Sequence, residues 1–200
     1  LGVDKDPQID DPEIALFWKG LPDNLSKLEN VIWAENPANL DDYAWCRGSD
    51  GISRVWHPGF HEGENFGWAG APDIVAEYKG KIVLGDLKTS NGPYYSQWPD
   101  SSTPKNEYGK RRSGFMKYQK CQLQLAAYAL GLEHTIGIVP ELCMTFVATK
   151  EISQVFVIQK GTIEKYKNKW RETVKKYYEV ILPEQKEREI EMLGIDGDIM

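Results

Sequence analysis

The chain of 200 residues has little cysteine, and Cys46, Cys121 and Cys143 are far apart with no CxxC pair. This scattered, odd set argues against a disulfide framework and against a zinc or iron–sulfur cage, because each needs several cysteines at short spacings. A long apolar run is also missing, whereas a membrane span requires about 18 consecutive apolar residues. We therefore expect no membrane segment, no iron–sulfur cluster and a reducing, intracellular compartment.

A surplus of basic residues is missing as well, since the net charge is −6. A protein that binds phosphates usually has a basic surface, so the sum alone argues against a nucleic-acid partner. The distribution of charge points the other way. Residues 1–80 contain 15 acidic against 6 basic residues, whereas residues 105–120 (KNEYGKRRSGFMKYQK) contain 6 basic residues and one acid. The sequence therefore predicts one positive region on an otherwise acidic protein.

The apolar pattern predicts a mixed α/β domain whose central mixed β-sheet is flanked by helices. Residues 11–42 (DPEIALFWKGLPDNLSKLENVIWAENPANLDD) favour two short helices and a strand, with Pro12 in a first helical turn and Gly20 as a stop. A long polar loop is expected from Thr89 to about Ser113. The remaining elements are strands over 51–57, 71–79, 81–88, 142–149 and 153–159, a helix over 114–134 with Gly131 near its end, and a closing helix over 162–182 before Pro183.

The hairpin GAPDIVAEYKGKIVLGDLKTS (residues 70–90) places three charged residues where apolar ones are expected. Asp86 and Lys88 are two apart on one strand and so share a face, and a turn at Gly80 folds Asp73 back beside Asp86. Two facing carboxylates repel unless a cation lies between them, and Mg²⁺ accepts this kind of ligand. The hairpin therefore fits metal-assisted phosphodiester hydrolysis. The alternative is an exposed salt bridge of little energetic worth.

The predicted helix after the loop adds a second set of polar residues. Gln124 and Tyr128 are four residues apart and lie on one face, and Lys117 and Cys121 continue that stripe toward the start of the helix. Core packing for Tyr128 and solvent exposure for Gln124 are the alternative interpretations.

Together, GAPD, GDLKTS and QLQLAAY resemble the three motifs of the PD-(D/E)XK nuclease superfamily in its RecB-like exonuclease branch. The similarity covers roughly residues 31–180 and is closest to the mitochondrial genome maintenance exonucleases and their phage and bacterial relatives. It implies a single nuclease domain over residues 1–200, with a restriction-endonuclease-like core over 31–180 whose sheet carries the active-site hairpin. The implied location is the cytoplasm of a bacterial or phage-infected host, or the mitochondrion if the source is eukaryotic.

The resemblance also implies roles for individual residues. Asp73, Asp86 and the Leu87 carbonyl would bind Mg²⁺ or Mn²⁺, and Lys88 would be the catalytic lysine. Gln124 and Tyr128 would position the substrate strand beside the site, while Thr89 and Ser90 would donate hydrogen bonds to a phosphate.

One part of the family pattern is missing, namely the upstream helix whose His or Glu completes the metal site. Its absence fits a chain whose first helix precedes Leu1. The alternatives within the chain are Glu35, His57, His61 and Glu62, although a surface or packing role is the simpler interpretation of each.

The basic block mixes cations with aromatic residues, as single-strand binding requires. Its candidate DNA-binding residues are Arg111, Arg112, Lys117 and Tyr118, and a solvated mobile loop is the alternative. We expect a DNA exonuclease that acts on single strands or free ends in replication, recombination or repair. The other hypotheses are a DNA-binding module that keeps the nuclease fold without turnover and a site-specific endonuclease of the same superfamily.

Overall fold

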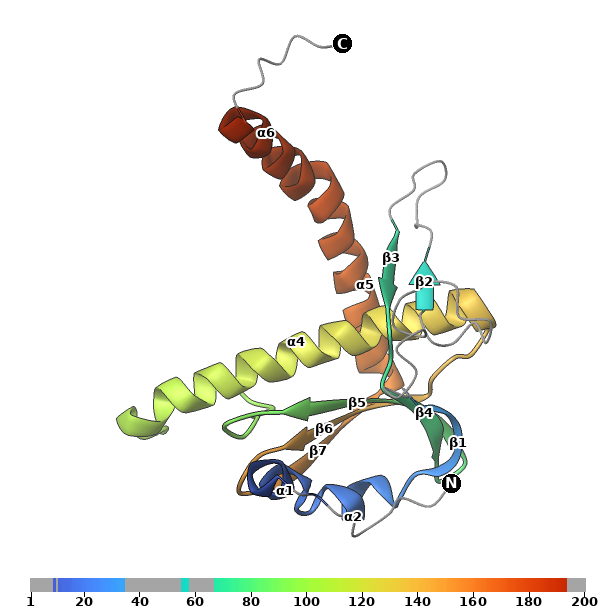
Figure 1. Ribbon diagram of the computed structural model, residues 1–200, viewed down its shortest axis with the longest axis vertical. Coiled ribbons are helices and arrows are strands. Elements are labelled where there is room, and N and C mark those ends of the chain that lie inside the picture. The colour runs from blue at the N-terminus through green and yellow to red at the C-terminus, as the bar shows by residue number, and fades with distance from the viewer. Residues whose placement is uncertain (1–8, 10, 35–54, 58–66, 194–200) are drawn as a thin grey trace.

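The computed structural model describes residues 9, 11–34, 55–57 and 67–193, which form a mixed α/β fold built on a five-stranded sheet (Figure 1). The strands β5 and β6 are parallel, and every other neighbouring pair in this sheet is antiparallel. The central mixed sheet flanked by helices is therefore confirmed. In spatial order the strands are β1 (Glu29–Ala34), β4 (Ile74–Tyr78), β5 (Lys81–Thr89), β6 (Leu142–Ala148) and β7 (Ser153–Gln159).

The two faces of this sheet are covered by different helices, with α4 (Lys105–Ile136) over one face and α1 (Pro12–Trp18) and α2 (Leu21–Leu25) on the other (Figure 1). The division follows from the two-residue period of a strand. Leu84 packs with the α4 side, whereas its neighbour Val83 packs with the α2 side. Both are fully buried, and each such side chain contributes about 1.5–3 kcal/mol of hydrophobic free energy.

The expected helix signals near the N-terminus are confirmed in the structure. Asp11 caps α1 through its carboxylate, which accepts hydrogen bonds from the backbone of Glu13 and Ile14, and Pro12 opens the first turn. Gly20 separates α1 from α2 and adopts a left-handed φ of 79°. Within the predicted strand over 51–57, the described part is β2 (Val55–His57).

A second, two-stranded sheet pairs β2 with β3 (Trp68–Gly70). The Trp68 ring packs edge-on against Trp170 of α5 (Lys160–Lys176), with ring centroids 5.8 Å apart. The Tyr178 hydroxyl donates a hydrogen bond to the Gly67 carbonyl. The small sheet is thereby attached to the C-terminal helix.

The expected polar loop up to Ser113 is wrong in its second half, because α4 already begins at Lys105. The basic block therefore lies on a helix rather than in a loop, and a Glu107–Arg111 ion pair at helical spacing supports its first turns. Gly131 is buried inside the helix, which ends at Gly137 with φ 72°.

The closing helix also continues past the expected stop before Pro183. After α5 the chain forms a π-helical turn, η1 (Tyr177–Ile181), and then α6 (Leu182–Leu193), which extends away from the sheet (Figure 1). The Leu182 N–H bonds to the Tyr177 carbonyl, five residues back. Pro183 follows in the first turn of α6, where its missing N–H costs least.

Within the part of the chain that the structure describes, none of the helices combines the length and the apolar character needed to cross a bilayer.

Candidate active site

The hairpin β4–β5 brings the predicted acidic residues together at the end away from its turn. The turn residues Lys79 and Gly80 have positive φ values of 51° and 72°, which suit the tightest hairpin connection. Ile74 pairs with Gly85 across the strands, so the next step of the same register places Asp73 opposite Asp86. The cross-strand arrangement expected from the sequence is confirmed.

Beyond Ile74 and Gly85, the last paired residues of β4 and β5, the Asp73 side chain hydrogen-bonds to the backbone edge of β5. Its Oδ2 accepts a hydrogen bond of 2.5 Å from the Leu87 backbone N–H. The N–H and C=O of one strand residue point to the same edge, so the Leu87 carbonyl faces this edge too. Asp73 and the Leu87 carbonyl, both predicted metal ligands, therefore share one end of the hairpin.

Asp86 and Lys88 form an ion pair on the face that α4 covers. Lys88 Nζ lies 2.7 Å from Asp86 Oδ2 and donates its hydrogen bond to Oδ1 at 2.9 Å. The Asp86 side chain is 1% exposed, and its burial raises the pKa to about 6, against the opposing effect of Lys88. Burial by itself lowers the pKa of Lys88, but the hydrogen bond and charge of Asp86 raise it above its ordinary value.

One buried oxygen atom beside this ion pair, Oγ1 of Thr145, has no hydrogen-bond partner among the described residues, and Thr145 pairs in register with Asp86 on β6. Asp86 Oδ2 accepts no hydrogen bond of good geometry, but the Lys88 ammonium group lies 2.7 Å from it. The Asp86 carboxylate is thus buried beside one cation, and its oxygen atoms can accept further positive charge.

The carboxylate and carbonyl oxygens at this end are hard donors of the kind that Mg²⁺ and Mn²⁺ accept. Among residues 9, 11–34, 55–57 and 67–193, no group of three or more His, Cys, Asp or Glu side chains is placed to hold a metal. The donors at this end that could hold such an ion are the carboxylates of Asp73 and Asp86 and the carbonyl of Leu87. Of the alternative upstream ligands, Glu35, His61 and Glu62 lie outside the described residues, as does the side chain of His57 in β2.

The helix α4 presents its predicted polar stripe along this end of the hairpin. Gln124 Nε2 donates to the Tyr128 hydroxyl at 2.5 Å, and Lys117 Nζ donates to the Ser90 hydroxyl at 3.0 Å. Burial raises the pKa of Tyr128, and the negative charge of Asp86 adds to that effect. The stripe expected from the sequence is thus confirmed as one continuous face.

The other candidate binding residues are placed differently by the structure. Thr89 is exposed at the end of β5, whereas Ser90 is buried and accepts the Lys117 hydrogen bond. Tyr118 packs on Phe156 of β7 with ring centroids 4.8 Å apart, so its ring is part of the protein's packing.

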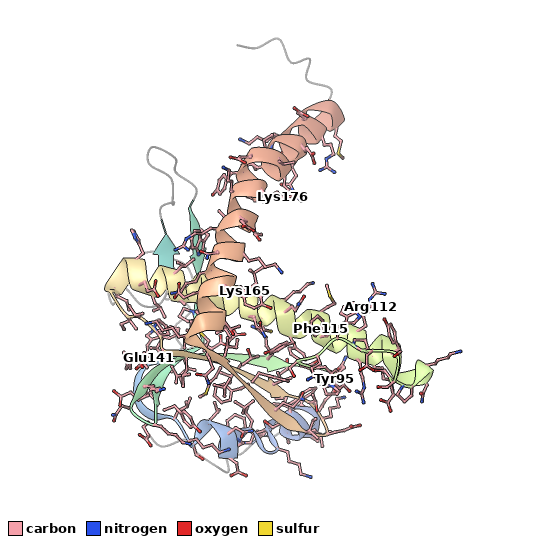
Figure 2. The ribbon with its side chains drawn as sticks, turned by 180° about the vertical axis from the view of Figure 1, so that it is seen from behind. Tyr95, Arg112, Phe115, Glu141, Lys165 and Lys176 are labelled. Carbon is pink, nitrogen blue, oxygen red and sulfur yellow. The ribbon has the colours of Figure 1, made fainter. Side chains whose placement is uncertain are left out.

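The two arginines of the basic block contact the loop that connects β5 to α4. Arg111 lies over the Tyr95 ring at 5.5 Å, and Arg112 lies over the Trp98 ring at 5.7 Å. Figure 2 shows Tyr95, Arg112 and Phe115 gathered at this end of α4. The arginines hold the loop on the helix.

Two features of the site were not found by sequence reasoning. Gly70 lies against the Tyr128 ring, where a Cβ would come within 2.3 Å of a ring carbon. Gln154 of β7 holds the loop after β5 through two hydrogen bonds to the Tyr94 backbone, of 2.9 and 3.1 Å. Gly70 could have been noticed because it stands three residues before Asp73, but nothing in the sequence marks Gln154.

The chain matches no family model and no curated protein. A solved structure titled "Crystal structure of SSO0001" is similar, with a TM-score of 0.33 and 15% identity over 57% of this chain. The match spans 46% of that structure's chain.

Proposed function

We propose that this chain is a metal-dependent DNA nuclease of the PD-(D/E)XK superfamily, in the RecB-like exonuclease branch. Its substrate would be single-stranded DNA or a DNA end, in replication, recombination or repair. The observation that supports this most is the grouping of Asp73, Asp86 and Lys88 at one end of a hairpin, with the Asp86 carboxylate buried and ion-paired to Lys88.

Each residue has a role that follows from its position. Asp73, Asp86 and the Leu87 carbonyl would hold Mg²⁺ or Mn²⁺, and such an ion supplies a Lewis acid that polarises phosphate oxygens and lowers the pKa of water. Lys88 would orient a water toward phosphorus and stabilise the negative charge that develops there. Its ion pair with Asp86 fixes the ammonium group in place before substrate arrives.

The neighbouring helix would position the substrate. The hydrogen bond between Gln124 and Tyr128 orients both side chains as a unit beside the hairpin. A correctly held strand presents its phosphate to the attacking water, and such positioning supplies a large part of an enzyme's rate.

A second candidate function is a DNA-binding domain without turnover. It is favoured by the small number of carboxylates, since Asp73 and Asp86 are not joined by a third His, Cys, Asp or Glu within the described part of the chain. A site-specific endonuclease of the same superfamily is the third possibility.

The test compares end-labelled linear and circular single-stranded DNA, each incubated with Mg²⁺ and either wild-type protein or Lys88→Ala. We expect wild-type protein to degrade the linear strand and leave the circle intact, and Lys88→Ala to be slower by about 10²-fold or more. Equal cleavage by both proteins would refute the site. Cleavage of the circle would indicate an endonuclease, and strand binding without cleavage would indicate the second candidate.

A further inference from the structure

A cavity of about 490 Å³ lies between the loop after β5 and the first turns of α4. Its volume is in the range of small-ligand pockets, about 300–1,000 Å³, which is enough to hold a nucleotide. The loop side is lined by Asn91, Gly92 and Tyr95, and the helix side includes Lys110, Ser113 and Lys117.

The two lysines extend the polar face of α4 away from the hairpin. Residues advance by about 100° along an α-helix, so Lys110 and Lys117 stand on nearly the same side, two turns and about 10 Å apart. Gln124 and Tyr128 lie on that same side further along. A nucleic-acid strand that contacts Gln124 and Tyr128 would therefore continue along the same side of α4 to Lys117 and then to Lys110.

Neither arginine of these turns lines this cavity. Arg111 is paired with Glu107 and lies over the Tyr95 ring, and it lines a separate cavity of about 420 Å³ that Tyr95 also lines. Arg112 lies over Trp98, whose ring also packs edge-on against Phe115.

The walls of the larger cavity are held by hydrogen bonds and close packing. Gln154 accepts a hydrogen bond from the Tyr94 backbone N–H and donates one to the Tyr94 carbonyl, which fixes Tyr94 at one end of the loop. Gly114 lets the loop approach the helix closely, since a Cβ there would lie 2.5 Å from the Pro93 carbonyl oxygen. A preformed groove of this kind binds a strand at a lower entropic cost than a mobile loop does.

We propose that this groove, with Lys110 and Lys117, binds the sugar–phosphate backbone of the unpaired nucleic-acid strand next to the bond being cut. The inference rests on the proposed function and deepens it, because it assigns the phosphate contacts to the two lysines rather than to Arg111 and Arg112. Glu151 also lines the groove, and its carboxylate opposes phosphate binding.

The test measures binding of a fluorescein-labelled oligothymidylate by anisotropy, in EDTA so that no cleavage occurs, at several salt concentrations. We expect Lys110→Ala and Lys117→Ala each to raise the Kd about three- to tenfold and to reduce the slope of log K against log salt by about 0.7. Glu151→Gln should lower the Kd about two- to threefold.

The matched control is Lys105→Ala, which removes the same charge from the same helix at a position about 140° around it from Lys110 that does not line the groove. We expect its effect to be clearly smaller than that of Lys110→Ala. Melting temperatures are recorded for all variants, because Lys117 contacts Ser90 whereas Lys110 is exposed.

Three outcomes would overturn the groove assignment: no binding by the wild-type protein, equal losses in Lys105→Ala and Lys110→Ala, or a larger loss in Arg112→Ala than in Lys110→Ala. Binding that follows the expected pattern in a protein without nuclease activity would refute the proposed function and leave the groove in place. Cleavage by wild-type protein, with no effect of Lys110→Ala on DNA binding, would support the proposed function and refute the groove.

Discussion

At the scale of single residues, the candidate site depends on charged side chains that are buried or partly buried. Asp86 lies in the covered face of the sheet, and Lys88 only partly balances its charge. Burying the Asp86 carboxylate without a full set of hydrogen bonds lowers the free energy of unfolding. A cation bound at the site would remove this local destabilisation.

The raised pKa of Asp86 predicts how stability of the metal-free protein depends on pH. The folded state binds this proton more tightly than the unfolded state, so the free energy of unfolding falls as the pH rises from about 4 to about 6. Asp86→Asn removes the titration. We expect it to become more stable relative to wild type over this interval, by up to about 3 kcal/mol.

Urea unfolding in EDTA at pH 4, 5, 6 and 7 measures this difference. Asp100→Asn serves as a flat control, because hydrogen bonds from Ser102 lower the pKa of Asp100, so that its contribution to stability changes mainly below pH 4. A difference between Asp86→Asn and wild type that does not change with pH would contradict the prediction.

At the scale of elements, two glycines in the same helix differ in what they do. Gly114 faces the loop, where a Cβ would approach the Pro93 carbonyl at 2.5 Å and the Tyr95 ring at 2.7 Å. Gly109, one and a half turns earlier, has no atom within 4 Å of the place where a Cβ would stand. The first glycine is required by packing, whereas the second only weakens the helix.

This contrast predicts opposite effects of the same substitution. Gly114→Ala should destabilise the protein by about 1–3 kcal/mol, because the loop must move away from α4. Gly109→Ala should stabilise it by about 0.5–1 kcal/mol, because alanine has the higher helix propensity. Chemical denaturation of both variants beside wild type measures the effects, and a stabilising Gly114→Ala would show that the loop is not packed as described.

At the scale of the whole molecule, the sheet and α4 form one body from which the C-terminal helix extends (Figure 1). Most of the contacts of α6 are with η1, and Met192 near its end is 87% exposed. The core clusters are made by residues of the sheet, α2, α4 and α5. Stability of the core should therefore not depend on α6.

A chain that ends after Ile181 tests this independence. We expect its melting temperature to stay within about 2 °C of the full chain, because no residue of the core clusters is removed. Differential scanning calorimetry measures the effect. A drop of more than about 5 °C would mean that α6 stabilises the sheet through contacts that the described residues do not account for.

Much of the fold could be predicted because it follows from local pattern. Apolar alternation identified the strands, and the turn at Gly80 fixed the register that places Asp73 opposite Asp86. Residue types predicted the wrong element where the contacts that decide it are not visible in the sequence. Residues 105–113 are polar and were predicted as the end of a loop, yet they form the first turns of α4, where Glu107 and Arg111 pair at helical spacing.

The sequence by itself determined the hairpin, its charged end and the polar stripe of the helix, because strand and helix periods are local properties of the backbone. Only the tertiary structure decided which cations of the basic block are available. Lys110 and Lys117 line the groove, although Lys117 also donates to Ser90 and lies over the Tyr94 ring at 5.9 Å. Arg111 and Arg112 lie over Tyr95 and Trp98 instead, and this division depends on a loop that Gln154 holds. Contacts between residues so far apart in the chain leave no periodic signal in the sequence.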